Sequence, residues 1–195
     1  MRTANVDVSV AELEREPYPT YARLRRDAPV AFVPSVRLWF VTRWHDVVRA
    51  AEDPVRFPAA LPGSPLDRTL GGVNVLTVDG DDHRRLRAPM EATLRPHRVM
   101  QTAPGIIESI AHRLIDAFAN DGRAELMSEY CEPLAVLSLA RVIGLPETLD
   151  ADTLRRWFTD LATGTSNYEN DAVKQPRADA VSREIDDVLR PHLAR

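Results

Sequence analysis

Cysteine is almost absent from this sequence: Cys131 is the single one in 195 residues. A disulfide within the chain and a zinc site built from thiolates both need at least two cysteines, so the composition excludes both. Proteins without disulfides are typical of reducing compartments. We therefore expect a cytoplasmic location.

Long hydrophobic runs are also missing. The longest charge-free apolar stretch, residues 133–140, is far shorter than the ~20 residues that a membrane-spanning helix needs. The first residues carry charge and contain no apolar core segment, so we expect no secretory signal and no membrane insertion.

Lysine is nearly absent as well, since Lys174 is the only one among 25 basic residues. The 29 acidic residues give a formal charge of −4, and this mild acidity argues against a general nucleic-acid partner because the field would repel phosphate. The 44% hydrophobic content at this length is typical of one globular domain.

Several catalytic and metal motifs are missing. There is no Gly-x-Ser-x-Gly elbow, no phosphate-binding Gly-Lys-Ser/Thr loop and no dinucleotide fingerprint. A calcium loop starting at Asp79 would need glutamate at its twelfth position, where Met90 stands. The five histidines show no paired metal spacing. We expect no metal site and no catalytic residue of these classes.

The first third of the chain predicts a small hairpin between short helices. Thr20 can cap a helix that ends near Asp27. Two runs rich in β-branched and aromatic residues, Val30–Val33 and Leu38–Thr42, predict a β-hairpin. A short helix follows and stops at Asp53-Pro54.

The remainder predicts a long loop and then helices. Residues 56–79 are rich in proline and glycine and predict an irregular loop, which is typical of functional segments. Carboxylates at the start of a helix are stabilised by its dipole, so Asp81 and Asp82 predict a helix over 81–93. Apolar spacing predicts helices over 106–118, 134–143, 154–161 and 181–189, the second of them apolar nearly all round. The polar stretch 163–176 is the only candidate linker. The expected fold is mainly α with a small β-hairpin.

Two residues in the helix over 81–93 are chemically informative. His83 and Arg87 are four positions apart, so they share one helical face and can hold an anion together. Exposed charged pairs at this spacing are common, however, and spacing alone favours two surface residues that pair with nearby acids.

Residues 41–50, 53–57 and 78–87 resemble, in the same order, the second strand, the B helix with its following turn, and the start of the C helix of the bacterial cytochromes P-450. These are haem-thiolate monooxygenases. The resemblance covers essentially the whole chain, through helices C to G. It implies that His83 and Arg87 bind haem propionates.

The same resemblance implies further roles. Substrate-pocket positions would be Val73, Asn74, Val75, Leu76, Leu161 and Ala162, and their mostly apolar character suggests a small apolar substrate. Arg84 and Arg85 would point away from the haem and, with Arg95 and Arg98, form a basic patch where an acidic ferredoxin-type redox partner could dock. A solvated basic face is an equal alternative.

The family's oxygen-activating helix, its Glu-x-x-Arg pair and its cysteine loop are not found in these 195 residues. Cys131 lacks the flanking glycines of that loop and is expected to be a small buried residue. We expect residues 1–195 to form the N-terminal portion of a cytochrome P-450 domain, inactive alone. Two alternatives stay open: a non-catalytic binding module, and one half of a split enzyme. A half-domain would expose apolar faces and would bind its missing half or self-associate.

Overall fold

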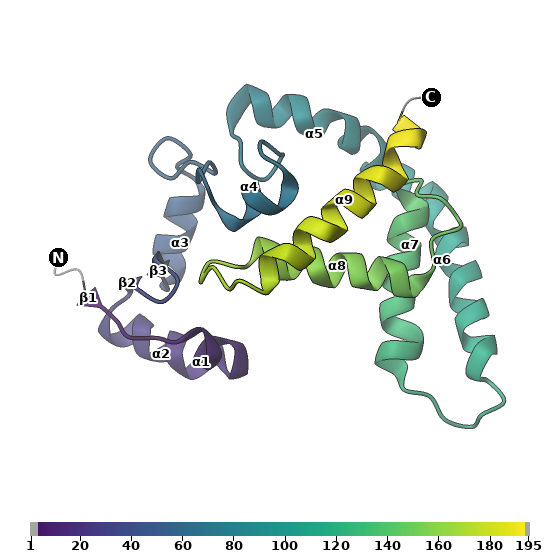
Figure 1. The fold of residues 1–195 in the computed structure, drawn as a ribbon, viewed down its shortest axis with the longest axis horizontal. Helices are drawn as coiled ribbons and strands as arrows, with labels where there is room; N and C mark the ends of the chain where they lie inside the picture. The colour runs from purple at the N-terminus through teal and green to yellow at the C-terminus, as the bar shows by residue number, and fades with distance from the viewer. Residues whose placement is uncertain (1–3, 194–195) are drawn as a thin grey trace.

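A computed structural model describes residues 4–193. The chain is mainly helical and forms an open arc, with a small sheet near its N-terminal end (Figure 1). The expected fold class is confirmed. Within residues 4–193, no helix combines the length and the apolar character required to cross a membrane.

The N-terminal part holds the predicted hairpin. Strand β2 (Val30–Val33) pairs antiparallel with β3 (Leu38–Val41), and the two-residue β1 (Ala4–Asn5) pairs parallel with β2. Helices α1 (Val10–Arg15) and α2 (Pro17–Asp27) precede the hairpin (Figure 1).

The predicted cap of α2 is wrong. The helix begins at Pro17, with Glu16 as its N-cap, because proline suits the first position of a helix, where no N–H is needed. Thr20 is instead buried inside the helix, and its hydroxyl donates a hydrogen bond to Glu12 of α1.

The prediction of an irregular loop over 56–79 is also wrong in part. After α3 (Trp44–Ala51), this segment contains α4 (Pro65–Leu70). The residues that suggested a loop mark the ends of a helix: Ser64 caps it, Pro65 opens it and Gly71, at a φ of 77°, ends it in the left-handed conformation.

Five longer elements complete the chain: α5 (Gly80–Leu94), α6 (Pro96–Phe118), α7 (Glu132–Val142), α8 (Ala151–Thr165) and α9 (Lys174–Leu193). Helix α6 starts ten residues before the predicted helix. In the helix predicted over 134–143, Leu139 of α7 and its C-cap Ile143 are exposed where we expected burial on most faces. The main core lies between α6, α7, α8 and α9, and its buried members are Ile110, Leu137, Ala140, Leu154, Trp157 and Val181.

Cys131 is exposed, which contradicts the expected burial. It closes the short π-helix η1 (Met127–Cys131), which has no buried residue. A small apolar side chain on this element therefore has nothing to cover it.

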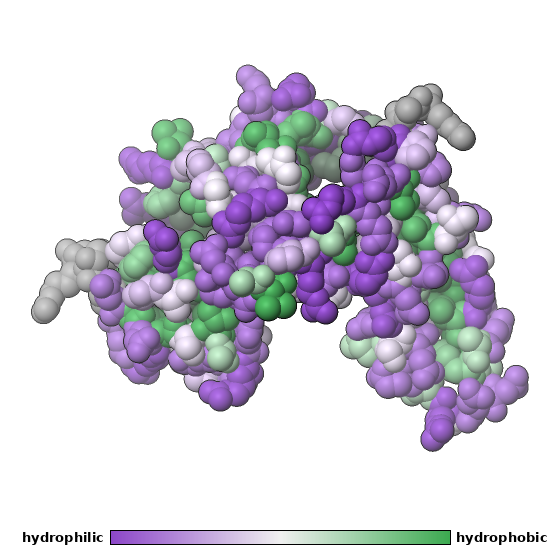
Figure 2. All heavy atoms as spheres, viewed as in Figure 1, coloured by the Kyte–Doolittle hydropathy of each residue, from purple (hydrophilic) through white to green (hydrophobic). Residues whose placement is uncertain are grey.

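The accessible surface of the chain is unusually large. It measures 13837 Å², whereas a compact monomer of 21.8 kDa exposes about 9,300 Å². Figure 2 shows apolar side chains at several places on the visible face. The chain therefore exposes about half as much surface again as a compact protein of its size.

Candidate functional site

The residue before α5 is bonded to the segment between α3 and α4, and the first turn of the helix is acidic. Asp79 precedes the helix, and its Oδ2 accepts the N–H of Ala59 at 2.7 Å. Asp81 and Asp82 lie in the first turn, where the positive end of the helix dipole stabilises carboxylates. This arrangement fixes the start of the helix that carries His83 and Arg87.

His83 and Arg87 line one cavity of about 490 Å³. They lie one turn apart on α5, as the spacing predicted. The other lining residues come from the preceding loop, from the rest of the same helical face and from the start of α6; they are Val75, Leu76, Met90, Glu91, Leu94, Arg95 and Pro96. The cavity therefore combines apolar side chains with a small set of charged ones.

The charges in the cavity favour an anion. Arg87 donates through Nε to Oε1 of Glu91 at 2.7 Å, but its guanidinium has five N–H donors and most of them remain available. The side chain of Arg87 is 55% exposed, so this ion pair is screened and weak. Arg95 makes no ion pair with any residue in the described range 4–193. An apolar ligand that carries carboxylates fits this donor set, and the propionates of haem are such carboxylates.

Sequence reasoning missed part of this site. Arg95 was assigned to an outer basic patch, but the structure places it in the wall of the cavity. The signal was available, since positions 83, 87, 91 and 95 follow one another in steps of four. Arg84 and Arg85 do not line the cavity, and each pairs with the aspartate three residues earlier on α5.

The loop before α5 contributes two of the four residues that sequence reasoning placed at the substrate. Val75 and Leu76 line the cavity with His83. Asn74 does not line it, but its Oδ1 accepts the N–H of Leu76 at 3.0 Å and so holds the turn that presents Leu76. Val73 is 78% exposed.

The two α8 positions lie elsewhere. Leu161 lines a groove between α4, α8 and α9, and Ala162 lines a separate hollow beside α1. The structure therefore does not bring them together with His83 and Arg87, and their role at a substrate stays a prediction.

No protein-family model matches the chain. Among curated proteins, it is 29% identical over 176 residues to the cyclomarin C epoxidase CymV of Salinispora arenicola, covering 88% of this chain and 44% of that protein. It is 33% identical over 151 residues to the cytochrome P-450 monooxygenase PikC of Streptomyces venezuelae, covering 73% and 36%.

Solved structures likewise match this chain over less than half of their own length. CalO2 matches with a TM-score of 0.73 at 27% identity, over 98% of this chain and 49% of that one. P450BioI, in complex with an acyl carrier protein ligated to hexadec-9Z-enoic acid, matches with a TM-score of 0.74 at 25% identity, over 89% and 46%. The chain spans less than half the length of each of these four relatives. In sequence and in fold, the chain is similar to the N-terminal portion of the cytochromes P-450.

Proposed function

We propose that this chain forms the N-terminal part of a haem-thiolate monooxygenase and that the α5 cavity holds the propionate edge of the haem. The observation that carries the proposal is the presence of His83 and Arg87 together in one largely apolar cavity. When bound with a thiolate ligand, haem supplies the iron that activates dioxygen for insertion into a substrate.

The residues of this chain would bind and orient that group. His83 would donate a ring N–H to one propionate, and Arg87 offers a planar fork of donors that suits a carboxylate. Arg95 would add positive charge at the end of the cavity. Leu76, Met90 and Leu94 would exclude water from the ring edge, because their apolar side chains line the same wall.

The axial thiolate would have to come from another polypeptide segment. Cys131, the one cysteine in the sequence, closes η1 and does not line the α5 cavity. We therefore expect residues 1–195 alone not to insert oxygen. The large exposed surface supports a role in which this chain packs against the segment that carries the thiolate.

The substrate is proposed to be a small apolar molecule. The exposed apolar side chains of Val73 and Leu76 on the loop before α5 support this class. A ferredoxin-type partner would dock near Arg84 and Arg85, where both guanidinium groups are exposed. Their pairing with Asp81 and Asp82 reduces the free positive charge available for such docking.

Haem binding tests the proposal directly. Haemin would be titrated into the chain, into a His83→Ala/Arg87→Ala variant, and into an Arg84→Ala/Arg85→Ala control with substitutions on the same helix outside the cavity. Charge-assisted hydrogen bonds contribute about 1.5–3 kcal/mol each, so the first variant should lose at least about tenfold in affinity. The control should bind as the unchanged chain does.

Circular dichroism of the two variants would establish that both keep their helices. Equal affinity for haemin in the His83→Ala/Arg87→Ala variant and the unchanged chain would overturn the assignment of this pair. A chain that binds no haemin at all would instead favour the alternative of a non-catalytic module derived from the same fold.

A further inference from the structure

One wall of the α5 cavity comes from the segment between α4 and α5. This segment carries Val75 and Leu76, which line the cavity. It continues directly from the C-terminal end of α4, and α4 packs against α8 and α9. The position of this wall therefore depends on how α4 is attached to α8 and α9.

Ser182 of α9 makes a direct attachment to α4. Its Oγ donates a hydrogen bond to the main-chain carbonyl of Thr69 at 2.7 Å. Thr69 lies in the last turn of α4, where carbonyl groups lack a partner within the helix. Because Thr69 is 2% exposed, water has little access to replace Ser182 as the donor. Ser182 therefore caps the C-terminal end of α4 from a different helix.

Further contacts enclose Thr69 between α8 and α9. Nε2 of Gln175, in the first turn of α9, donates hydrogen bonds to Oγ1 of Thr69 at 3.4 Å and to Oδ1 of Asp179 at 2.8 Å. Gly164 of α8 has no side chain, and a Cβ at this position would lie 2.8 Å from Oγ1 of Thr69. The end of α4 is therefore held closely on both helices.

Hydrogen bonds continue from the end of α4 to the cavity wall. Gly72 donates its N–H to the carbonyl of Asp67 at 2.8 Å, and its own carbonyl accepts Nδ2 of Asn74 at 2.9 Å. The Oδ1 of Asn74 accepts the N–H of Leu76. Oγ1 of Thr77, a buried residue, accepts the N–H of Asn74 at 3.2 Å. The segment that lines the cavity is thus tied to α4.

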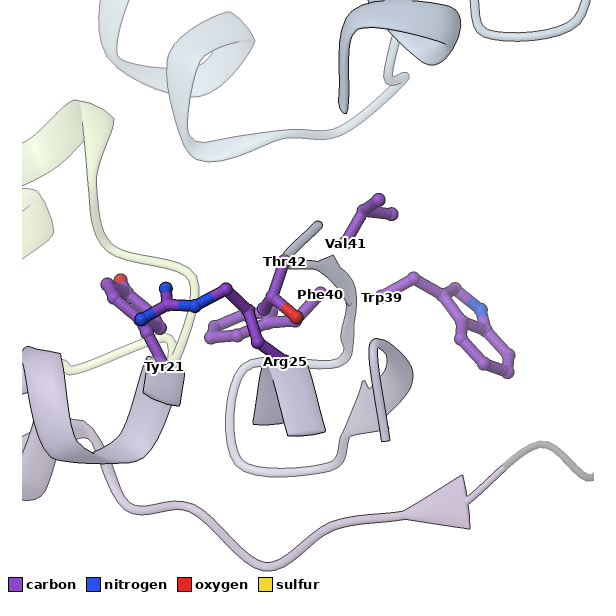
Figure 3. A pocket seen from close by; sticks show the side chains of 6 residues that line it. All are labelled: Tyr21, Arg25, Trp39, Phe40, Val41 and Thr42. Carbon is purple, nitrogen blue, oxygen red and sulfur yellow. The ribbon is translucent and has the colours of Figure 1, made fainter. Parts of the chain in front are cut away.

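The N-terminal hairpin takes no part in these contacts. Its own pocket, of about 400 Å³, is lined by side chains from α2, from β3 and from the residue after β3 (Figure 3). They are Tyr21, Arg25, Trp39, Phe40, Val41 and Thr42. None of these residues belongs to α4, α8 or α9. Strand β3 is therefore a suitable internal reference for measurements on the segment after α4.

We propose that Ser182 is a positioning residue for the α5 cavity. Its hydrogen bond fixes the C-terminal end of α4 on α9, and the bonds between α4 and Thr77 carry this placement to Val75 and Leu76. A displacement of α9 at Ser182 therefore alters the cavity wall beside His83. The proposal concerns the shape of the cavity and does not depend on haem as its ligand.

Amide exchange measured by NMR on the full chain tests this role in two variants. Ser182→Ala leaves a buried carbonyl without a partner, so exchange at Leu76 and Thr77 should become at least about fivefold faster. Ser182→Thr keeps the hydroxyl and should retain the slow exchange of the unchanged chain at both amides. Exchange in β3 should stay the same in both variants.

Glu184→Gln is the matched control on the same helix. It removes the ion pair with Arg156 of α8 and leaves the contacts of α4 in place, so exchange at Leu76 and Thr77 should not change. Three results would each overturn the proposal. They are no faster exchange at these amides in Ser182→Ala, the same acceleration in Ser182→Thr, and an equal acceleration in Glu184→Gln or in β3, which would indicate a general loss of stability.

Discussion

The four-helix region α6–α9 and the site helix α5 differ sharply in how far this chain packs them. In α6–α9, six apolar residues are buried in one cluster, and Trp157 at its centre is 5% exposed. Helix α5 touches chiefly α6, and its apolar residues Met90 and Leu94 remain exposed in the cavity wall.

Helices α6–α9 supply the packed core of the chain, whereas α5 carries the candidate site. The α6–α9 cluster buries six apolar residues within the chain, although Leu139 of α7 and Phe158 of α8 stay exposed. On α5, the apolar residues Met90 and Leu94 stay exposed in the wall of the cavity that His83 and Arg87 line. The accessible surface of 13837 Å² exceeds the area expected for a compact monomer of this mass. The excess is on the order of the area buried in a large obligate interface.

Among the substitutions considered, Trp157→Ala should lower the free energy of unfolding the most. Removal of a buried tryptophan leaves a cavity and typically lowers the free energy of unfolding by about 3–5 kcal/mol. The matched change on α5, Met90→Ala, removes an exposed side chain and should change it by less than about 0.5 kcal/mol. Urea unfolding followed by circular dichroism measures both. Similar losses of unfolding free energy in the two variants would contradict the difference in packing between α6–α9 and α5.

Gly164→Ala should have the next largest effect. A Cβ at Gly164 would lie 2.2 Å from Cβ of Ala178 and 2.8 Å from Oγ1 of Thr69, where α4, α8 and α9 meet. Overpacking of this kind typically costs about 1–3 kcal/mol.

Gly105 is the control for that substitution. It lies in α6, and an added Cβ there meets nothing within 4 Å. Gly105→Ala should therefore raise the free energy of unfolding by up to about 1 kcal/mol, because alanine is the better helix former. The melting temperatures of the two variants should shift in opposite directions. A higher melting temperature for Gly164→Ala would show that α4, α8 and α9 pack loosely around Gly164.

The smallest expected effect is a pH dependence across α8 and α9. Arg156 donates two hydrogen bonds to the carboxylate of Glu184, at 2.6 and 2.8 Å, and this lowers the pKa of Glu184. A lowered folded-state pKa stabilises the fold above the unfolded-state pKa of about 4.3, and the contribution is lost as the pH falls through the folded value.

Glu184→Gln should therefore lose less stability than the unchanged chain between pH 7 and pH 3. Both groups are more than one-third exposed, so at pH 7 the substitution should cost less than about 1 kcal/mol. Glu147→Gln, at an exposed position without an ion pair in the described part of the chain, is the control. Identical acid unfolding curves for Glu184→Gln and the unchanged chain would show that the pair of Arg156 and Glu184 does not contribute to stability.

Sequence periodicity predicted the existence of the long helices α6–α9, because each of them has apolar residues that pack against neighbours within the chain. Ile110 and Leu114 of α6, for example, face the core at the expected spacing. Short elements were harder to predict: α4 has only six residues, and its proline and glycine neighbours are equally typical of a loop. The exposure of Leu139 and Cys131 could not be predicted, because a pattern of apolar residues does not say whether the covering layer belongs to the same chain.

The candidate site was predictable only in part. Spacing placed His83 and Arg87 on one face of a helix, and the structure sets both in one cavity wall. Their role in binding the haem propionates came from the family resemblance and stays a prediction. The surroundings of Leu161 and Ala162 depend on where α8 lies relative to α4, α9 and α1, which are distant from it in sequence and which periodicity does not place.

Hydrogen exchange by mass spectrometry, with and without haemin, tests whether ligand binding protects α5. We expect amides in α8 and α9 to be protected in the free chain and amides in α5 to exchange much faster. Haemin should then slow exchange in α5 by at least about tenfold and leave α8 and α9 nearly unchanged. Two results would contradict this expectation: amides of α5 as protected as those of α8 before haemin is added, or exchange in α5 that haemin does not slow.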